Sequence, residues 1–448
     1  MTTWSTTVGA NQPFLEVTYA YSSRATLMDV SNNTSFRIQY RLLAIMSGRY
    51  QLVYRIKNSS GTNVFSSYKY YYITPNWTAD TFYIQNIATE MYMIAEESDS
   101  YDDANVHQSL FSIISQEQWE IMPIDGGFCE IISLYSGKYV GVSANDTSAV
   151  KQYGASSDYT KWYLNEMPNG HYVIANKYWS STIRSLAVPS DTSGAETNLV
   201  VSSYTNDTYY RDEWNIYPVK YTATLINKYD HGYHVYYNET ETQSVSLINE
   251  YSYAMAERYL ELFGLLIYME DATYFRSPID ICKVNILSSN INTLCDHSNS
   301  HTHNAALPSD FYFVGNNTTT YAYWTAHGIE AVLGQGIENR SFRSTTCVYI
   351  LERVNPLYSS IRKENTIGVL MHEMGHIYGA KDHYHELADS SDPNSCKFKD
   401  ICSFCGTNPR PNTCIMYQSR IDISASNVFC VSCFGEVKNH LDDHHEVN

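Results

Sequence analysis

Short runs of alternating hydrophobic and polar residues fill the first part of the chain. Residues 35–45 read SFRIQYRLLAI, residues 49–58 read RYQLVYRIKN, and NSSG at 58–61 has the composition of a turn. A period of two places the apolar side chains on one face of a strand. We predict a small β-region over residues 1–78, whose role the sequence does not indicate.

A tryptophan recurs at the end of three consecutive stretches between residues 79 and 219. Trp119, Trp162 and Trp214 each close a stretch that opens on a strand-like segment and continues through turns rich in Ser, Asn and Asp. A unit of about four short strands cannot bury its own apolar face, so the three units should share one core. We expect the tryptophans to anchor that core, and Cys129 to be a buried free thiol.

Helical periodicity begins in the second half of the chain. SLINEYSYAMAERYLELF at 246–263 predicts a helix that ends at Gly264, and LLIYM at 265–269 predicts a strand. A further apolar, β-prone stretch covers residues 346–351. The tail at 425–448 begins as a helix and ends acidic, so we expect a solvated end.

The stretch NTIGVLMHEMGHIYGAKDH at 365–383 combines a predicted helix with metal-binding residues. It opens on a capping residue, repeats apolar residues at helical spacing, and ends at Gly379, which suits a left-handed stop. His372 and His376 stand one turn apart on one face, so both imidazoles can reach one divalent ion. Glu373 can act on a water as a base without being a ligand. These residues are the equipment for hydrolysing a peptide bond with zinc.

Two histidines leave a zinc ion under-coordinated, so a third protein ligand should follow the turn. Asp382 is the favoured candidate, and His383 or His385 is the alternative. A separate group of histidines offers a second metal site, although polar turns also collect histidines that bind nothing. This group consists of His297, His301 and His303.

Length, charge and composition limit the number of domains and the kinds of binding partner that we expect. At 448 residues we expect two or three domains, and a net charge of -18 argues against nucleic acid or an anionic membrane as the main partner. No apolar run approaches the length that spans a bilayer. The amino terminus lacks the basic and apolar segments of a signal peptide, which fits a numbering that begins after a removed signal.

Cysteine usage indicates an oxidising compartment. Nine of the ten cysteines fall between Cys282 and Cys433, and this density favours disulfides and secretion. The spacing of Cys402 and Cys405, and of Cys430 and Cys433, leaves a structural zinc site as the alternative to disulfides.

The pattern HExxHxxGxxD resembles the extended zinc signature of the metzincin metalloproteases. Its positions are filled by His372, Glu373, His376, Gly379 and Asp382. The resemblance implies that Zn²⁺ is held by the two histidines and the aspartate, and that Glu373 is the catalytic base.

Two other segments extend this resemblance. Metzincins place a methionine-bearing turn beneath the metal, and Met416 stands where that turn is expected. In the same family the strand before the zinc helix lines the substrate cleft, so an extended peptide could add alongside it. The residues implied for this substrate edge are Val348, Tyr349 and Ile350.

Residues 79–219 resemble the ricin-type β-trefoil, whose repeats end in a Gln-x-Trp signature. None of the three tryptophans here follows a glutamine by two positions. Ile94, Gly141 and Ala187 stand where the family often has a sugar-binding aspartate. Glycan binding through other loops, protein binding and positioning of the enzyme are the roles left open for this module.

These patterns predict a multidomain protein, in which an all-β amino-terminal part including a β-trefoil precedes an α+β metzincin-like catalytic domain. The predicted domains are 1–78, 79–219 and 220–448, the last rich in cysteine after 395. We expect a secreted, monomeric zinc endopeptidase that cuts protein or glycoprotein substrates, with the trefoil for targeting or positioning. The alternative is a glycan- or protein-binding module that carries a structural, non-catalytic metal domain.

Overall fold

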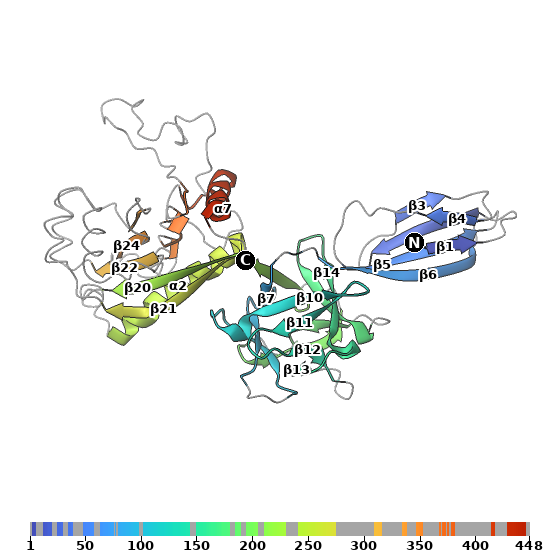
Figure 1. Cartoon of the computed structure of the whole chain (residues 1–448), viewed down its shortest axis with the longest axis horizontal. Coiled ribbons are helices and arrows are strands. Elements are labelled where there is room, and N and C mark those ends of the chain that lie inside the picture. Colours follow the sequence, from blue (N-terminus) through green and yellow to red (C-terminus); the bar gives the residue numbers. More distant parts are fainter. Residues whose placement is uncertain are drawn as a thin grey trace, which may run out of the picture. The chain divides into compact units, whose positions relative to one another are not determined.

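The computed structural model divides the chain into two compact units, Met1–Pro218 and Val219–Asn448 (Figure 1). The residues that the structure describes are 2–5, 12–19, 25–29, 35–38, 48–57, 63–75, 77, 79–97, 102–143, 149–179, 184–189, 194–204, 210–229, 241–274, 309–315, 334–337, 346–352, 367–368, 370–372, 374–375, 378–380, 414–416 and 428–444. The predicted all-β part belongs to the first unit, and the predicted metal-binding stretch to the second.

The first residues form strands, as their alternating pattern predicts. A two-stranded antiparallel sheet pairs β1 (Thr2–Ser5) with β4 (Ser35–Ile38). A four-stranded antiparallel sheet has the order β3-β2-β5-β6. Its strands are Ala25–Asp29, Gln12–Tyr19, Gly48–Lys57 and Asn63–Ile73 in that order.

The end of this β-region contacts the strands that follow it in the first unit. The backbone N–H of Arg49 donates to Asn165 Oδ1 at 2.9 Å. The ring of Tyr72 lies on Phe128 and Tyr163, with centroid separations of 4.4 and 5.3 Å. Residues 1–78 therefore share part of their packing with the neighbouring module.

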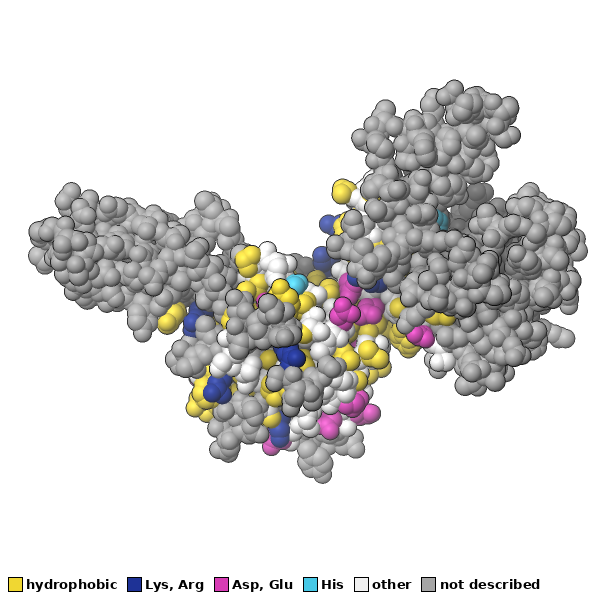
Figure 2. All heavy atoms as spheres, turned by 180° about the vertical axis from the view of Figure 1, so that it is seen from behind, with side chains coloured by type: hydrophobic (Ala, Val, Ile, Leu, Met, Phe, Trp, Pro, Cys, Tyr) yellow, Lys and Arg dark blue, Asp and Glu magenta, His cyan; other side chains and the backbone are white. Residues whose placement is uncertain are grey.

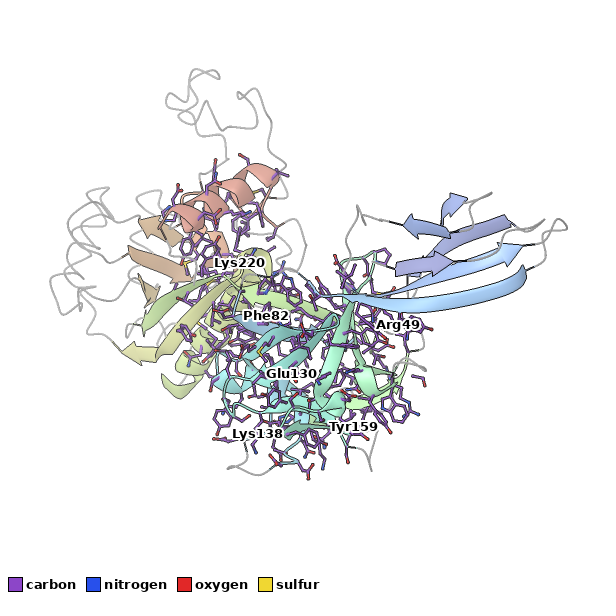
Figure 3. The ribbon with its side chains drawn as sticks, turned by 45° about the vertical axis from the view of Figure 1, so that its right-hand side comes forward. Arg49, Phe82, Glu130, Lys138, Tyr159 and Lys220 are labelled. Atoms are coloured by element: carbon purple, nitrogen blue, oxygen red, sulfur yellow. The ribbon has the colours of Figure 1, made fainter. Side chains whose placement is uncertain are left out.

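Thirteen short strands, paired antiparallel, make up the module that follows. They are β7 Thr81–Asn86, β8 Tyr92–Ala95, β9 Val106–Ser109, β10 Trp119–Ile124, β11 Phe128–Ser133, β12 Tyr139–Val142, β13 Val150–Tyr153, β14 Lys161–Glu166, β15 Tyr172–Asn176, β16 Arg184–Ala187, β17 Thr197–Asn198, β18 Val200–Ser203 and β19 Trp214–Val219. Figure 3 shows their side chains packed between the strands, with Phe82 and Glu130 among them. This is the all-β repeat architecture that the tryptophan pattern predicts.

The three tryptophans occupy equivalent places in this core, which confirms their predicted role. Trp119, Trp162 and Trp214 each have 0% of their surface exposed. Each indole N–H donates to a backbone carbonyl between 22 and 28 residues earlier, so the polar edge of each ring is satisfied inside the core. The acceptors are Met93 O at 3.0 Å, Val140 O at 2.8 Å and Leu186 O at 2.9 Å.

The residue two positions before each tryptophan is also buried, although it is never glutamine. Glu117, Thr160 and Asp212 are 0%, 1% and 4% exposed. Glu117 accepts from the N–H and the O–H of Ser112 at 2.8 and 2.7 Å, and Thr160 Oγ1 accepts from the N–H of Ser157 at 2.8 Å. The residue at this position is therefore buried in each repeat, although its side chain differs from the glutamine of the Gln-x-Trp signature.

The three positions that correspond to a sugar-binding aspartate are buried as well. Ile94 and Ala187 are 8% and 3% exposed. A Cβ on Gly141 would lie 2.8 Å from Thr160 Cγ2 and 3.0 Å from Tyr159 O, so the repeat has no room there for a larger side chain. Any glycan site in this module has to use other residues.

The surface of the first unit carries mixed side chains. On the face in Figure 2, the described acidic residues stand among hydrophobic and uncharged polar ones, and the described lysines and arginines are scattered.

The second unit is built on a five-stranded sheet of order β21-β20-β22-β24-β23 (Figure 1). The strand β20 (Tyr221–Tyr229), the helix α2 (Glu241–Phe263) and the strand β21 (Leu265–Tyr274) form a parallel βαβ unit. The helix and the strand that the sequence predicts at 246–269 are confirmed, and the helix ends at Gly264 with φ +70°. The strands β22 (Ser309–Gly315) and β24 (Thr346–Glu352) continue the parallel pairing, whereas β23 (Gly334–Ile337) is antiparallel to β24.

The prediction that Val348, Tyr349 and Ile350 form a substrate edge is wrong. These residues lie in β24, which pairs with β22 on one side and with β23 on the other. Both rows of backbone groups are therefore used within the sheet, and a peptide cannot add there. Among the described strands, β23 is the one that ends the sheet on this side.

Helix α7 (Val431–His444) packs into the second unit, which corrects the expectation of a solvated end for this part of the tail. Cys433, Val437 and Leu441 are each 0% exposed and follow one another at spacings of four. The hydroxyl of Tyr221 on β20 donates to the carboxylate of Asp442. No helix in the described part of the chain is both long and apolar enough to cross a bilayer.

Candidate metal centre

The described residues 367–368, 370–372 and 374–375 are helical and are called the metal helix below. Its apolar residues Ile367, Leu370, Met371 and Met374 are at most 2% exposed, as their spacing of three and four predicts. The hydroxyl of Tyr259, on α2, donates to Met371 O at 3.0 Å. The buried face of the metal helix is therefore fixed against α2.

The metal helix ends in a left-handed turn at Gly379, as predicted. Gly379 has φ +82°, a conformation that costs a residue with a Cβ about 1–2 kcal/mol. The N–H of Ala380 donates to Gly375 O at 2.9 Å, and the N–H of Tyr378 donates to Met374 O at 3.1 Å. The hydrogen bond from Ala380 to Gly375 closes a six-residue turn, which is the pattern of a Schellman motif. The motif ends the helix shortly before the predicted third ligand.

His372 is oriented by a main-chain carbonyl of residues 414–416, which are called the Met416 turn below. Its Nδ1 lies 2.9 Å from Ile415 O. A carbonyl only accepts, so the ring donates from Nδ1, and in the neutral ring the lone pair is then on Nε2. This arrangement fixes the tautomer that a metal-binding imidazole needs, and a histidine ligand usually has such a partner. The geometry of His372 therefore fits a zinc ligand.

The Met416 turn lies against the metal helix. Cys414, Ile415 and Met416 are all 0% exposed. A Cβ on Gly375 would lie 2.7 Å from Met416 Sδ, so the turn approaches the helix at a residue without a side chain. This close approach brings the carbonyl of Ile415 within reach of His372.

Several predicted site residues lie outside the described part of the chain. Glu373, His376 and Asp382 are among them, and their roles stay predictions. The same holds for the alternative ligands His383 and His385. The histidines proposed for a second metal, His297, His301 and His303, also lie outside it.

Helix α7 contributes a residue that the sequence did not point to. The rings of His440 and Tyr378 meet edge to face at 5.9 Å, and a Cβ on Gly379 would lie 3.5 Å from His440 Nδ1. His440 thus lies beside the turn that ends the metal helix. The signal that could have placed it is the spacing of the buried residues on the same helix, which are Cys433, Val437 and Leu441.

Tyrosines around the metal helix are held in their protonated form. Burial raises the pKa of Tyr259 and of Tyr378 above the ordinary range. Partial burial and the nearby carboxylate of Asp442 raise the pKa of Tyr221 to about 12. At neutral pH these phenols are packing groups and donors, and they are not bases.

Comparison with known proteins supports this interpretation of the second unit. Residues 211–429 match the model of metallo-peptidase family M12, a range that contains the metal helix and the Met416 turn. The family model thus finds an M12 metallo-peptidase domain in this part of the chain. Residues 115–202 match the ricin-type β-trefoil lectin domain-like model, so a lectin-like domain precedes the M12 domain.

Several solved structures are similar to about a third of the chain. The designed 3-fold symmetric protein ThreeFoil shares 22% identity over 31% of this chain and 97% of its own, with a TM-score of 0.28. The Rhizoctonia solani agglutinin shares 15% identity over 32% of this chain and 96% of its own, with a TM-score of 0.28. A mosquitocidal holotoxin shares 20% identity over 32% of this chain and 18% of its own, with a TM-score of 0.30. No curated protein matches the chain.

Proposed function

We propose that the protein is a secreted zinc-dependent endopeptidase. The observation that carries the proposal is the bond from His372 Nδ1 to Ile415 O at 2.9 Å, because it presets Nε2 as a ligand within the M12 domain. His376 and Asp382 would complete the protein ligands, and His383 or His385 is the alternative to Asp382. Zinc, when bound, supplies a Lewis acid that polarises the scissile carbonyl and acidifies a water.

The other steps belong to side chains of this chain. Glu373 takes the proton of the attacking water and returns it to the leaving amine, which is general acid–base catalysis by one carboxylate. The hydrogen bond to Ile415 O holds the orientation of the His372 ring fixed during the reaction. An aspartate at position 382 makes the site less positive than three histidines would, so donors around it should compensate.

Substrate binding is assigned to the end of the sheet and to the lectin-like domain. An extended peptide could pair with β23 (Gly334–Ile337), which ends the described sheet, in place of the edge first expected at β24. The lectin-like domain would bring the enzyme to glycoprotein or protein substrates. Because Ile94, Gly141 and Ala187 are buried, its glycan contacts would come from other loops.

The test is replacement of Glu373 by glutamine in the full-length, zinc-loaded chain. Incubation with a mixed proteome, followed by identification of new protein termini, should show cleavage by the wild type that a chelator abolishes. Glu373→Gln should lower the rate by about 10²- to 10⁴-fold while the zinc content is kept, because the base is lost and the ligands are not. Glu97→Gln, at an exposed position of the first unit, is the matched control and should be fully active.

Two results would count against the proposal. If Glu373→Gln cleaves as fast as the wild type with zinc bound, the assigned base is wrong. If the zinc-loaded wild type cuts nothing but binds a glycan array, the protein is a binding module with a structural metal domain.

A further inference from the structure

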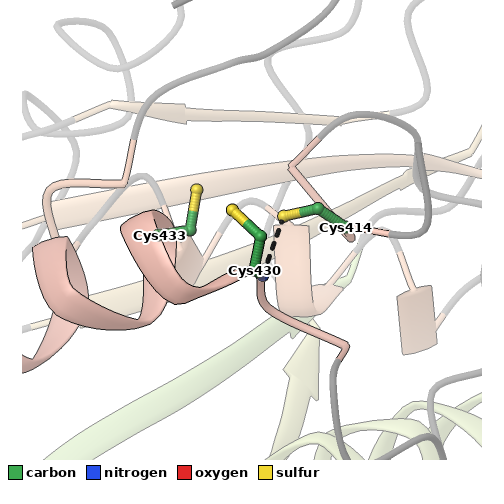
Figure 4. Close-up of side chains that lie close together, drawn as sticks. All are labelled: Cys414, Cys430 and Cys433. Carbon is green, nitrogen blue, oxygen red and sulfur yellow. Dashed lines mark hydrogen bonds between the residues drawn. The ribbon is translucent and has the colours of Figure 1, made fainter. Parts of the chain in front are cut away.

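Cys414 of the Met416 turn meets Cys430 and Cys433, which lie at the start of α7. Cys414 belongs to the turn, Cys430 directly precedes α7, and Cys433 lies in the first turn of α7. Their sulfur atoms all lie within 4.8 Å of one another, and the residues are 0%, 7% and 0% exposed. Figure 4 shows the three side chains pointing toward one another.

Two polar features of the main chain lie beside these sulfurs. The N–H of Cys430 donates to Cys414 Sγ at 3.3 Å, which is the dashed line in Figure 4. Cys430 and Cys433 stand at the amino-terminal end of α7, where the helix dipole stabilises negative charge. The N–H of Cys430 and the positive end of the α7 dipole therefore both lie beside the buried sulfur cluster.

The arrangement of the three sulfurs suits one metal ion better than a covalent bond. Around a tetrahedral zinc with Zn–S bonds of about 2.3 Å, neighbouring sulfurs are about 3.8 Å apart, which is inside the observed limit. A disulfide within the cluster would use two sulfurs and leave the third buried beside them. Thiolates select zinc over hard cations such as Ca²⁺ and Mg²⁺, which prefer oxygen.

We propose that Cys414, Cys430 and Cys433 hold a structural zinc ion, distinct from the metal at His372. Three thiolates leave one position of a tetrahedral zinc open, and a water would fill it. The site keeps Cys430 and Cys433, one of the two pairs that the sequence suggested, and adds Cys414 from the Met416 turn, whereas Cys402 and Cys405 lie outside the described residues. This inference stands beside the proposed peptidase activity and does not depend on it.

Such an ion would support the catalytic centre through the main chain. Cys414 precedes Ile415, whose N–H donates to Val428 O at 2.7 Å and whose carbonyl receives the His372 bond. Linking Cys414 to the start of α7 therefore fixes the carbonyl that orients His372. The three cysteines act on the peptidase site as positioning residues.

The experiment is a zinc count on the full-length chain by elemental analysis, with variants that remove one site at a time. The wild type should hold two zinc ions per chain. His372→Ala should keep the cysteine-bound ion, and Cys433→Ser should lose it. Cys129→Ala, which removes a buried thiol of the first unit, is the matched control and should keep both.

A spectrum of the wild type avoids dependence on the folding of any variant. Reconstitution with Co²⁺ should give the intense near-ultraviolet sulfur-to-cobalt band that a three-thiolate site produces. A spectrum without that band, or peptide mapping under non-reducing conditions that finds two of the three cysteines in a disulfide, would overturn the inference. Loss of zinc on His372→Ala alone, with none on Cys433→Ser, would do the same and leave the proposed peptidase intact.

Discussion

At the scale of single residues, burial decides the chemistry of several groups outside the metal centre. Glu117, Asp212 and Glu213 are at most 4% exposed in the first unit, and each has a hydrogen-bond partner. Buried carboxylates of this kind are tolerated because their acceptor oxygens are satisfied. His107 on β9 is also largely buried, and burial there disfavours the charged imidazolium.

His107 should make the first unit sensitive to acid. Burial lowers its pKa below the ordinary value of 6.5, and Glu196, whose Oε2 lies 3.8 Å from Nε2, opposes this in part. The unfolded chain therefore binds the proton more tightly than the folded one. The stabilising contribution is present above pH 6.5 and is lost as the pH falls through the lower folded pKa.

His107→Gln tests this because glutamine does not titrate. Urea unfolding of wild type and variant at pH 7.5 and pH 5, followed by tryptophan fluorescence, should show the smaller loss of unfolding free energy in the variant at acid pH. Equal losses in the two proteins would contradict the assignment.

Gly375 sets the distance between the metal helix and the Met416 turn. Gly375→Ala places a methyl group 2.7 Å from Met416 Sδ and 3.3 Å from Phe429 Cε1, so the turn must move. We expect a loss of about 1–3 kcal/mol in unfolding free energy and weaker zinc binding, both measured on the full-length chain.

The matched control for Gly375→Ala is Gly435→Ala on α7. A Cβ on Gly435 meets nothing within 4 Å, so alanine should stabilise that helix by up to about 1 kcal/mol. Similar effects from both substitutions would show that the contact with Met416 does not matter.

At the scale of elements, the metal helix depends on how it ends. Gly379→Ala should cost about 1–2 kcal/mol, because alanine is strained at φ +82°, and should also weaken zinc binding by disturbing the chain reversal. Gly379→Asn should cost less, since asparagine tolerates this conformation better. Thermal unfolding and a zinc titration of both variants measure the two effects. Equal costs would point to crowding against His440, which lies near the same position.

Elements with a regular spacing of apolar residues were predictable from the sequence. The position of a strand within its sheet was not, because it depends on which strands pair. The apolar spacing in 246–263 was enough to find α2, and three tryptophans were enough to find the repeats, because one face of each element is buried. The edge strand was misplaced because GQGI in β23 has no apolar alternation, and sheet order depends on pairing partners that a single strand does not reveal.

The candidate site was predictable as far as it is local in the sequence. The HExxH spacing and the glycine that ends the helix can be found along one segment. The contact of His372 with Ile415 spans 43 residues, and the contact of Cys414 with Cys430 spans 16, so only the fold shows them. The packed face of α7 was visible in principle, since Val437 and Leu441 are four apart, but the polar and acidic residues around them hid it.

At the scale of the whole molecule, the chain contains two units that differ in the residues expected to stabilise them. The first unit has a core of aromatic and aliphatic side chains around three tryptophans, whereas the second contains the residues proposed to bind metal. The M12 domain and the lectin-like domain are matched by separate family models. Their stabilities should therefore respond differently to metal.

A chelator should uncouple the two unfolding transitions. Removal of zinc should lower the melting temperature of the second unit, because ligand binding to the folded form stabilises it, and should leave that of the first unit unchanged. Six of the seven tryptophans belong to residues 1–218, so fluorescence follows the first unit and calorimetry follows both. A fluorescence transition that shifts with the chelator would show that the units do not unfold independently.

The partner of the His372 ring is a peptide oxygen, and every amino acid brings one. Exchanging Ile415 for another residue of similar size should therefore leave the ring where it is, whereas inserting or deleting a residue within 414–416 would place a different peptide group opposite the ring. Natural variation at 414–416 should accordingly change the identity of residue 415 and not the length of this short segment.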